Sequence, residues 1–329
     1  MAHPRLDRLQ LHLNPASTSG NARKLRVGII GLGDITEKSF APSVLESPLA
    51  ELVAVCRRNV SEAQKFAARW SEKQGGEPIA AYTSAAELVA DPRVDAVIVA
   101  TMTDTHEEYT VLAAKAGKHV LVEKPMARNA NEARRMVTAA RDAGVSLSVA
   151  YRRRMFPQVV EALRLIEMGR IGKVVCVRTH YSGNMEIASG AWRGDPEIGG
   201  ALMEMACHRL AVLLDFGGEV ESLSAMIDTV RTDRGWTVDD TDAMVVRFKS
   251  GLIGVHSTIL TSPPRHDFVQ IDGTEGRIII ENLEYFSDSL VIETSGAPGP
   301  NGNLVNRETV TVPCVQSLLI LLYYTDHAH

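Results

Sequence analysis

The 329-residue chain has few cysteines, few aromatic residues and no long apolar run near its start. Its four cysteines, Cys56, Cys176, Cys207 and Cys314, include no C-x-x-C pair, so the sequence indicates neither a zinc site nor a disulfide framework. We therefore expect buried, reduced thiols in a cytoplasmic protein. Residues 1–24 contain no long apolar stretch and predict an extension rather than a secretory signal or a membrane span.

The chain also lacks an excess of positive charge. Lysine and arginine number 35 against 40 acidic residues, and the resulting net charge of −5 gives no basic field that would favour nucleic acid. Apolar residues make up 45% and charged residues 23%, which is ordinary for a globular protein with a large core. At roughly 150 residues per domain, the length suggests two domains.

The sequence LRVGIIGLGDI is the feature around which the first half is organised. An apolar run followed at once by glycines predicts a buried strand that enters a tight turn. Gly31 lets the turn close, and Gly33 lets the backbone approach a pyrophosphate. A helix that begins near Asp34 and Ile35 would point its N–H groups at that phosphate. Thr36 stands where a third glycine is common, and an ordinary strand-to-helix turn is the alternative.

Two arginines stand where an acid that accepts ribose hydroxyls is usual. Residues 51–56 predict the second strand, and Arg57 and Arg58 follow it directly. A carboxylate would repel a 2′-phosphate, whereas a guanidinium can bind it through a fork of hydrogen bonds. We therefore predict NADP as the cofactor; NAD, with two solvated surface arginines, is the alternative.

A second loop is expected at the same edge of the sheet. Residues 94–100, VDAVIVA, predict a strand that is buried on both faces, as in a parallel sheet. The loop that follows contains Thr101, Thr103 and His106. Ligands of open α/β sheets bind beyond the carboxyl ends of the strands, so these residues should face the cofactor.

Charged residues also follow the next apolar strand, residues 118–122. Glu123, Lys124 and Pro125 come directly after it and are well placed to act on a ligand. A partly desolvated Lys124 can keep its charge against a substrate oxygen, or lose it and act as a base. The alternative is a surface ion pair between Glu123 and Lys124.

The pattern changes in the second half of the chain. Helices and strands alternate over residues 25–151, which predicts a doubly wound nucleotide-binding domain. Over residues 152–329 one helix is followed mainly by strands separated by turn signals, which predicts an α+β domain with a mostly antiparallel sheet. Arg154, in a basic trio at the junction, is a candidate for binding phosphate or lining a cleft, or a solvated turn residue.

One later segment stands out, ALMEMACHRLAVLLDFGG, residues 201–218. Glu204 and His208 lie four residues apart and so share one helical face. A carboxylate one turn from a histidine can orient the ring and support its proton, as in a general acid/base. The alternative is a solvated pair or a core histidine. A zinc site is not indicated, because no third ligand stands nearby in the sequence.

Several stretches together resemble a known family. They are VGIIGLGDI, ATMTDTH, VLVEKP, YRRRMFP, IGKV, WRGDPEIGGALMEMACH and IDGTEGRI, in order between about residues 25 and 282. They are similar to the glucose-fructose oxidoreductase / inositol dehydrogenase / rhizopine-catabolism (GFO/IDH/MocA) family. The resemblance implies an N-terminal Rossmann domain and a C-terminal domain with an open-faced sheet for substrate binding and oligomer contacts, hence a homodimer or homotetramer.

The resemblance also implies roles for single residues. Lys124 and His208 match the family's lysine and histidine that serve substrate binding and proton transfer beside the nicotinamide. Glu204 stands where the family usually has an aspartate, and Ala211 replaces another. Arg57 also replaces an aspartate, and family members with a base there tend to use NADP. Family members typically continue with a further helical segment, whereas this chain ends in VQSLLILLYYTDHAH.

Together these features predict an NADP-dependent dehydrogenase or ketoreductase that acts on a sugar, a polyol or a similar small alcohol. His208, oriented by Glu204, would take or give the hydroxyl proton, and Lys124 would polarise the same oxygen. Candidates for contacting the substrate are Arg154, Tyr181, Trp192 and Arg193, with His180 as a weaker one.

Two other functions stay open. Some relatives with this fold cleave glycosides through a transient oxidation and do not consume their NAD. A non-catalytic protein that senses NADP is the other alternative, although it would have no need for Lys124 and His208.

Overall fold

The computed structural model describes residues 23–187, 191–283, 289–299 and 302–312. These residues form two compact units, a first unit that ends at Ala150 and a second unit that begins at Tyr151. Residues 1–22 of the predicted extension, Cys314 and the C-terminal segment VQSLLILLYYTDHAH lie outside the described residues.

The first unit is built on a six-stranded parallel sheet with the order β3-β2-β1-β4-β5-β6. The order reverses between β1 and β4, which is the arrangement of a doubly wound Rossmann fold. The predicted fold class of this half is thereby confirmed. The strands are β1 (Leu25–Ile30), β2 (Ala50–Cys56), β3 (Ala80–Tyr82), β4 (Ala96–Val99), β5 (His119–Val122) and β6 (Leu147–Val149).

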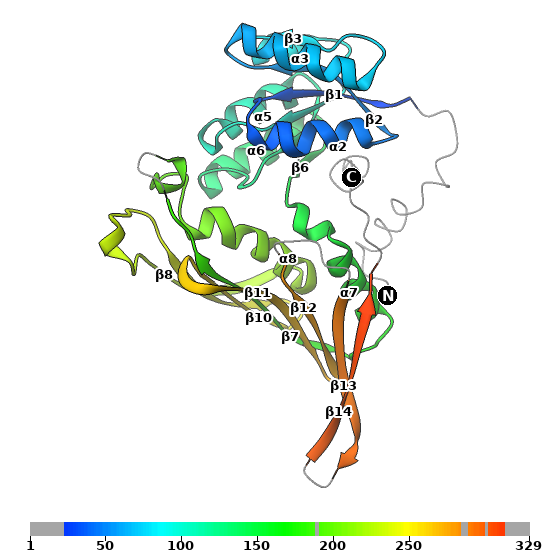
Figure 1. The fold of residues 1–329 in the computed structure, drawn as a ribbon, viewed down its shortest axis with the longest axis vertical. Coiled ribbons are helices and arrows are strands. Elements are labelled where there is room, and N and C mark those ends of the chain that lie inside the picture. Colours follow the sequence, from blue (N-terminus) through cyan, green and yellow to red (C-terminus); the bar gives the residue numbers. More distant parts are fainter. Residues whose placement is uncertain (1–22, 188–190, 284–288, 300–301, 313–329) are drawn as a thin grey trace. The chain divides into compact units, whose positions relative to one another are not determined.

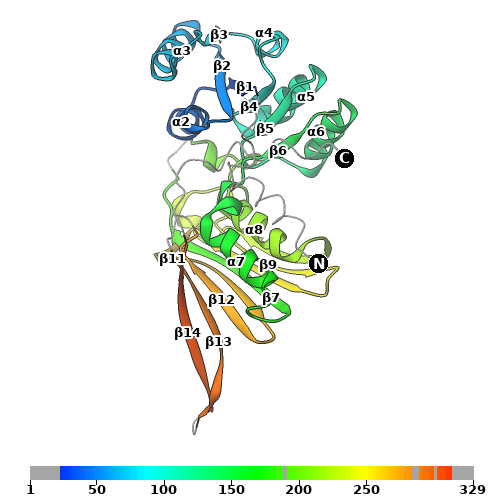
Figure 2. The ribbon, with the colours of Figure 1, turned by 90° about the vertical axis from the view of Figure 1, so that its right-hand side faces the viewer.

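Helices cover both faces of this sheet, as Figure 2 shows. Strand β4 explains the continuous apolar run in the sequence: Ile98 joins the core on the α2 and α3 side, whereas Val97 and Val99 join the core on the α4 to α6 side. The helical segments are η2 (Thr36–Phe40, a π-helix), α2 (Ala41–Glu46), α3 (Val60–Gln74), α4 (Ala85–Ala90), η3 (Thr103–Thr105), α5 (His106–Lys115) and α6 (Ala130–Asp142).

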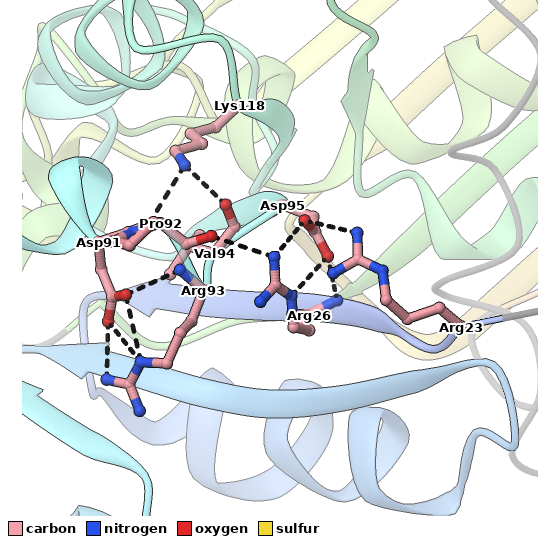
Figure 3. Close-up of polar contacts among 8 residues, drawn as sticks. All are labelled: Arg23, Arg26, Asp91, Pro92, Arg93, Val94, Asp95 and Lys118. Atoms are coloured by element: carbon pink, nitrogen blue, oxygen red, sulfur yellow. Dashed lines mark hydrogen bonds and ion pairs between the residues drawn. The ribbon is translucent and has the colours of Figure 1, made fainter.

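A polar network ties together the amino ends of β1, β4 and β5 (Figure 3). Asp95 accepts hydrogen bonds from Arg26 Nε at 3.1 Å and from Arg23 Nη2 at 3.0 Å. Lys118 Nζ donates to the carbonyl oxygens of Asp91, at 3.2 Å, and Val94, at 2.7 Å. Charged side chains thus satisfy the loop backbone at the end of the sheet opposite the glycine turn.

The second unit contains an eight-stranded sheet with the order β14-β13-β12-β11-β7-β10-β9-β8. Only β7 and β10 run parallel among its described pairs, so the prediction of a mostly antiparallel sheet is confirmed. The strands are β7 (Val174–Asn184), β8 (Val220–Asp228), β9 (Thr241–Phe248), β10 (Ile253–Ile259), β11 (Thr261–Gly273), β12 (Gly276–Glu281), β13 (Ser289–Gly299) and β14 (Gly302–Thr311).

Helices α7 (Pro157–Glu167) and α8 (Cys207–Gly217) lie against one face of the large sheet in both ribbon views (Figure 1, Figure 2). Strand β9 shows the consequence, since Met244 and Val246 are buried toward the helices while Val245 is 52% exposed on the other face. The remaining helical segments of this unit are η4 (Arg152–Met155), η5 (Trp192–Gly194), η6 (Leu202–Ala206, a π-helix) and η7 (Thr232–Arg234).

Strands β13 and β14 were not predicted from the sequence. The two strands form a hairpin that projects from the rest of the sheet (Figure 1, Figure 2). Leu290 and Ile292 at the start of β13 are buried and alternate with more exposed residues, but the strand then runs into TSGAPG. Glycine and proline are typical of turns, so the local pattern does not predict this strand. It is formed by pairing, with β12 up to Thr294 and with β14 beyond that residue.

Candidate functional site

The glycine turn after β1 has the geometry that close approach of a phosphate requires. Gly31 has a φ of +97°, and a Cβ there would lie 2.4 Å from the carbonyl oxygen of Ala100. A Cβ on Gly33 would have no neighbour within 4 Å, so the backbone at Gly33 is open to a ligand. The buried Thr36 donates from Oγ1 to the Gly31 oxygen at 2.7 Å and closes the turn in place of a third glycine. The turn therefore fits a dinucleotide pyrophosphate.

The helical stretch begins at Asp34 and Ile35, where the sequence predicted it. Backbone N–H groups in the first turn of a helix have no partner within the helix and point toward its amino end. The exposed Asp34 side chain pairs with Lys38 at 2.6 Å, and Ile35 packs against the core. These positions can offer backbone N–H groups to a phosphate.

Arg57 and Arg58 follow β2, next to the glycine turn, because Gly31 N donates to the Cys56 oxygen at 3.1 Å. Arg57 Nη1 donates to the Leu32 oxygen at 2.6 Å, which holds the guanidinium against the turn. Its Nε lies 2.5 Å from Glu62 Oε2, a contact that the sequence analysis missed. Arg58 is exposed.

The other two predicted loops lie at the same edge of the sheet. Ala100 N donates to the Ile30 oxygen at 2.8 Å, so the loop that contains Thr101 and Thr103 begins beside the glycine turn. Glu123 N donates to the Val99 oxygen at 2.9 Å, which places Lys124 beside that loop. Lys124 is half-buried, and its backbone N–H donates to Glu123 Oε2 at 2.6 Å. The Lys124–Pro125 peptide bond is cis.

His106 links these two loops. Its ring is 1% exposed, with Nδ1 3.0 Å from the Pro125 oxygen and Nε2 3.2 Å from the Thr101 oxygen. Burial lowers the pKa of His106, although the two carbonyl groups oppose that shift. His106 thus joins the loop that contains Thr101 to the turn that contains Pro125. Direct contact between His106 and the cofactor stays a prediction.

In the second unit, Glu204 and His208 lie on the segment formed by η6 and α8. Both side chains are largely buried, and the His208 ring meets Tyr151 edge-on, with 6.4 Å between the ring centroids. Glu204 Oε1 accepts from Arg193 Nε at 3.2 Å. The segment is π-helical around Glu204, where we expected a regular α-helix, and such widened turns are frequent at functional sites.

The structure brings some of the predicted substrate residues together and separates others. Trp192 and Arg193 join Glu204, since the Arg193 guanidinium lies over the Trp192 ring at 4.5 Å. Tyr181 is buried beneath η6 in a cluster with Ala201 and Met205.

Arg154 and His180 have contacts that the sequence did not reveal. Arg154 Nε donates to both carboxylate oxygens of Asp215 on α8, at 2.9 and 2.8 Å, so this arginine anchors the helix. His180 alternates with Tyr181 along β7 and therefore faces the side of the sheet away from α8, where its Nδ1 lies 2.8 Å from Ser257 Oγ. A role for His180 beside His208 is not supported by this geometry.

Two further groups that sequence reasoning missed hold this segment. Asp239 Oδ2 accepts from Leu202 N at 2.8 Å, and a Cβ on Gly200 would lie 2.0 Å from Asp239 Oδ1. Arg209 is fully buried and pairs with Asp267 at 2.8 Å. The doublet Gly199-Gly200 was the available sequence signal for the close approach of Asp239. No local signal marks the Arg209–Asp267 pair, because its partners lie 58 residues apart.

Over the described ranges, no group of three or more histidine, cysteine or acidic side chains is arranged to hold a metal ion. Within the same ranges, no helix combines the length and the apolar character needed to cross a membrane.

Comparison with known proteins agrees with the fold and the glycine turn. Residues 25–151 match a model described as an oxidoreductase family with an NAD-binding Rossmann fold, and residues 159–279 match the GFO/IDH/MocA C-terminal domain. The fold, the turn and these matches define an NAD-binding oxidoreductase. The chain belongs to the GFO/IDH/MocA family. The predicted family membership and the predicted class of enzyme, an NAD(P)-dependent dehydrogenase or reductase, are both confirmed.

Individual relatives are moderately similar. The chain is 32% identical over 264 residues to 1,5-anhydro-D-fructose reductase of Ensifer adhaerens, with 78% of this chain and 76% of the relative covered. It is 30% identical over 266 residues to myo-inositol 2-dehydrogenase of Thermotoga maritima, with 79% and 76% covered. Among solved structures, levoglucosan dehydrogenase in complex with NADH and L-sorbose has a TM-score of 0.75 at 26% identity, with 88% of this chain and 80% of that chain covered.

Proposed function

We propose that the protein is an NADP-preferring oxidoreductase that acts on a sugar, a polyol or a related small alcohol or ketone. The observation that carries the proposal is the edge of the first unit where three loops meet: the open backbone at Gly33, the loop after β4 and the turn that holds Lys124. The names of the relatives, which include a reductase of an anhydro-sugar and a dehydrogenase of an inositol, support the substrate class.

The residues proposed to hold the cofactor fit a dinucleotide. Gly31, Gly33 and the first N–H groups of the helix at Asp34 and Ile35 would hold the pyrophosphate. Arg57 would bind a 2′-phosphate, because a guanidinium matches phosphate geometry. Others proposed to line the cofactor are Arg58, Thr101, Thr103, His106, Glu123 and Lys124.

When bound, nicotinamide supplies or accepts the hydride. We propose that His208 takes the hydroxyl proton during oxidation and returns it during reduction, because imidazole exchanges protons near neutral pH. Lys124 would donate a hydrogen bond to the substrate oxygen and stabilise its developing negative charge. Arg193 and Trp192 would contact the substrate, and Glu204 would hold Arg193 in position.

A His208→Gln variant tests this assignment. Glutamine fills similar space but cannot carry the proton, so we expect kcat to fall by about 100-fold or more while NADPH binding is unchanged. Turnover would be followed by absorbance at the nicotinamide band over a panel of sugars and polyols, and binding by fluorescence titration. Undiminished turnover in this variant would refute the role of His208. Failure of the wild type to bind either cofactor would refute the proposed function itself.

Two further predictions concern the whole protein. Assembly into a homodimer or homotetramer through the sheet face opposite α7 and α8 is supported by apolar side chains that are exposed among the described residues, such as Met226 at 83% and Val245 at 52%. Sedimentation equilibrium would check it, and a monomer mass at micromolar concentration would contradict it.

The cytoplasmic location also stays a prediction, which cell fractionation would check.

A further inference from the structure

Arg57 is held between two groups that the sequence does not place together. Its Nη1 donates to the Leu32 oxygen at 2.6 Å in the glycine turn, and its Nε lies 2.5 Å from Glu62 Oε2 in the first turn of α3. The backbone of Glu62 is fixed at the start of α3, because the side chain of Asn59 caps this helix and accepts from Glu62 N at 3.2 Å. The acid and the base therefore sit side by side at the end of β2.

We propose that Glu62 determines how strongly the protein discriminates between NADPH and NADH. In this view Glu62 competes with a 2′-phosphate for Arg57, and it offers a carboxylate to the ribose hydroxyls of the cofactor that lacks this phosphate. The proposal rests on the proposed function, since it needs a nucleotide at this edge of the sheet.

The charges explain the competition. A 2′-phosphate carries between one and two negative charges, and the fork of Arg57 is the group that recognises it. The Glu62 carboxylate already occupies the Nε side of that fork. A bound phosphate must displace Glu62 or accept a second negative charge close by, and either change weakens NADPH binding.

The same contact accounts for binding of the other cofactor. In dinucleotide folds an acid about 20 residues past the glycines accepts the ribose hydroxyls. Position 57 holds a base, but the structure brings the carboxylate of Glu62 to within hydrogen-bonding distance of it. Glu62 thus supplies in space the acid that is absent from its usual place in the sequence.

The size of the effect follows from exposure. The side chains of Arg57 and Glu62 are 43% and 49% exposed, so water and salt screen their interaction. A pair of this kind changes affinity by a factor of about three to five, rather than by orders of magnitude. We therefore expect a graded preference and not an absolute switch.

The test is a Glu62→Gln variant of the full chain. Glutamine removes the charge but keeps an oxygen that can accept from Arg57 Nε, so the guanidinium keeps its place. We expect NADPH to bind about threefold to fivefold tighter and NADH about threefold weaker, which changes their affinity ratio about tenfold. Adenosine 2′-monophosphate carries the distinguishing phosphate without the nicotinamide half, and its own dissociation constant should fall by about threefold to fivefold in the variant.

Glu72→Gln is the matched control. Glu72 lies on the same helix and is exposed, and its substitution removes the same charge. The ratio of NADPH to NADH affinity in this variant should therefore equal that of the wild type. Weaker NADPH binding by Glu62→Gln would overturn the proposal, because Glu62 would then serve to orient Arg57 for the phosphate. An unchanged ratio would also overturn it. Neither result would touch the proposed function as long as the wild type binds a cofactor.

Discussion

At the scale of single residues, the two glycines of the turn have different physical tasks. Gly31 is required by the fold, since its φ of +97° is unfavourable for other residues and a Cβ would overlap Ala100. Gly33 has room for a side chain in the protein itself, since a Cβ there has no neighbour within 4 Å. The pyrophosphate is the group that would need that room.

This difference yields a matched pair of variants. Gly33→Ala should keep the thermal midpoint of the wild type within about 2 °C but weaken binding of both cofactors by at least about tenfold. Gly31→Ala should lower the midpoint itself, because the turn must move away from Ala100. Calorimetry and fluorescence titration would separate the two effects. Unweakened cofactor binding by Gly33→Ala would contradict the assignment of this turn to the phosphate.

At the scale of elements, the segment formed by η6 and α8 is fixed at three places along its length. Asp239 holds its start at Leu202, Arg209 pairs with Asp267 on β11, and Arg154 pairs with Asp215 near its end. The Arg209–Asp267 pair is the most deeply buried of these, with side-chain exposures of 0% and 2%. The element that carries His208 is therefore rigidly positioned on the sheet.

Breaking the buried pair should destabilise the second unit strongly. Asp267→Ala leaves the Arg209 charge buried without its carboxylate partner, and we expect a loss of about 3–5 kcal/mol in the free energy of unfolding. Urea denaturation would measure it. Asp233→Ala is the control, because its pair with Arg231 is solvent-exposed and should contribute at most about 1 kcal/mol. Equal effects of the two substitutions would show that the buried pair does not anchor the helix.

At the scale of the whole molecule, two carboxyl groups near the amino ends of the first sheet link stability to pH (Figure 3). The hydrogen bond from Arg93 lowers the pKa of Asp91 to about 2. Burial would raise the pKa of Asp95, but hydrogen bonds from Arg26 and Arg23 outweigh it and lower the value to about 2. Since the pKa of an unfolded aspartate is about 3.9, the unfolded chain binds more protons than the folded protein between these values.

The stability from these groups should therefore be complete above about pH 5 and be lost as the pH falls from there toward 2. Each carboxyl contributes on the order of 2 kcal/mol. The urea midpoint of the wild type, measured from pH 6 to 2, should fall more steeply in this window than that of Asp95→Asn. Parallel curves for the two proteins would indicate that Asp95 titrates alike in the folded and unfolded states.

Much of the fold could be predicted from local patterns. The apolar run before Gly31 and the run VDAVIVA predicted strands that are indeed central in a parallel sheet, because a strand buried on both faces must be apolar throughout. The hairpin of β13 and β14 was missed, because its strands are held by pairing with neighbours and contain turn-forming residues. The π-helical turn at Glu204 was missed as well, since spacing alone does not distinguish it from an α-helix.

The sequence by itself determined the alternating strands and helices of the first unit, the glycine turn and the family of this protein, because each depends on residues that are close together along the chain. Only the tertiary structure decided the partners of the charged side chains: Arg57 with Glu62, Arg154 with Asp215, and Arg209 with Asp267. A charged group pairs with whatever opposite charge the packing of helices and strands brings within about 4 Å, and that distance is set by the fold rather than by position in the sequence.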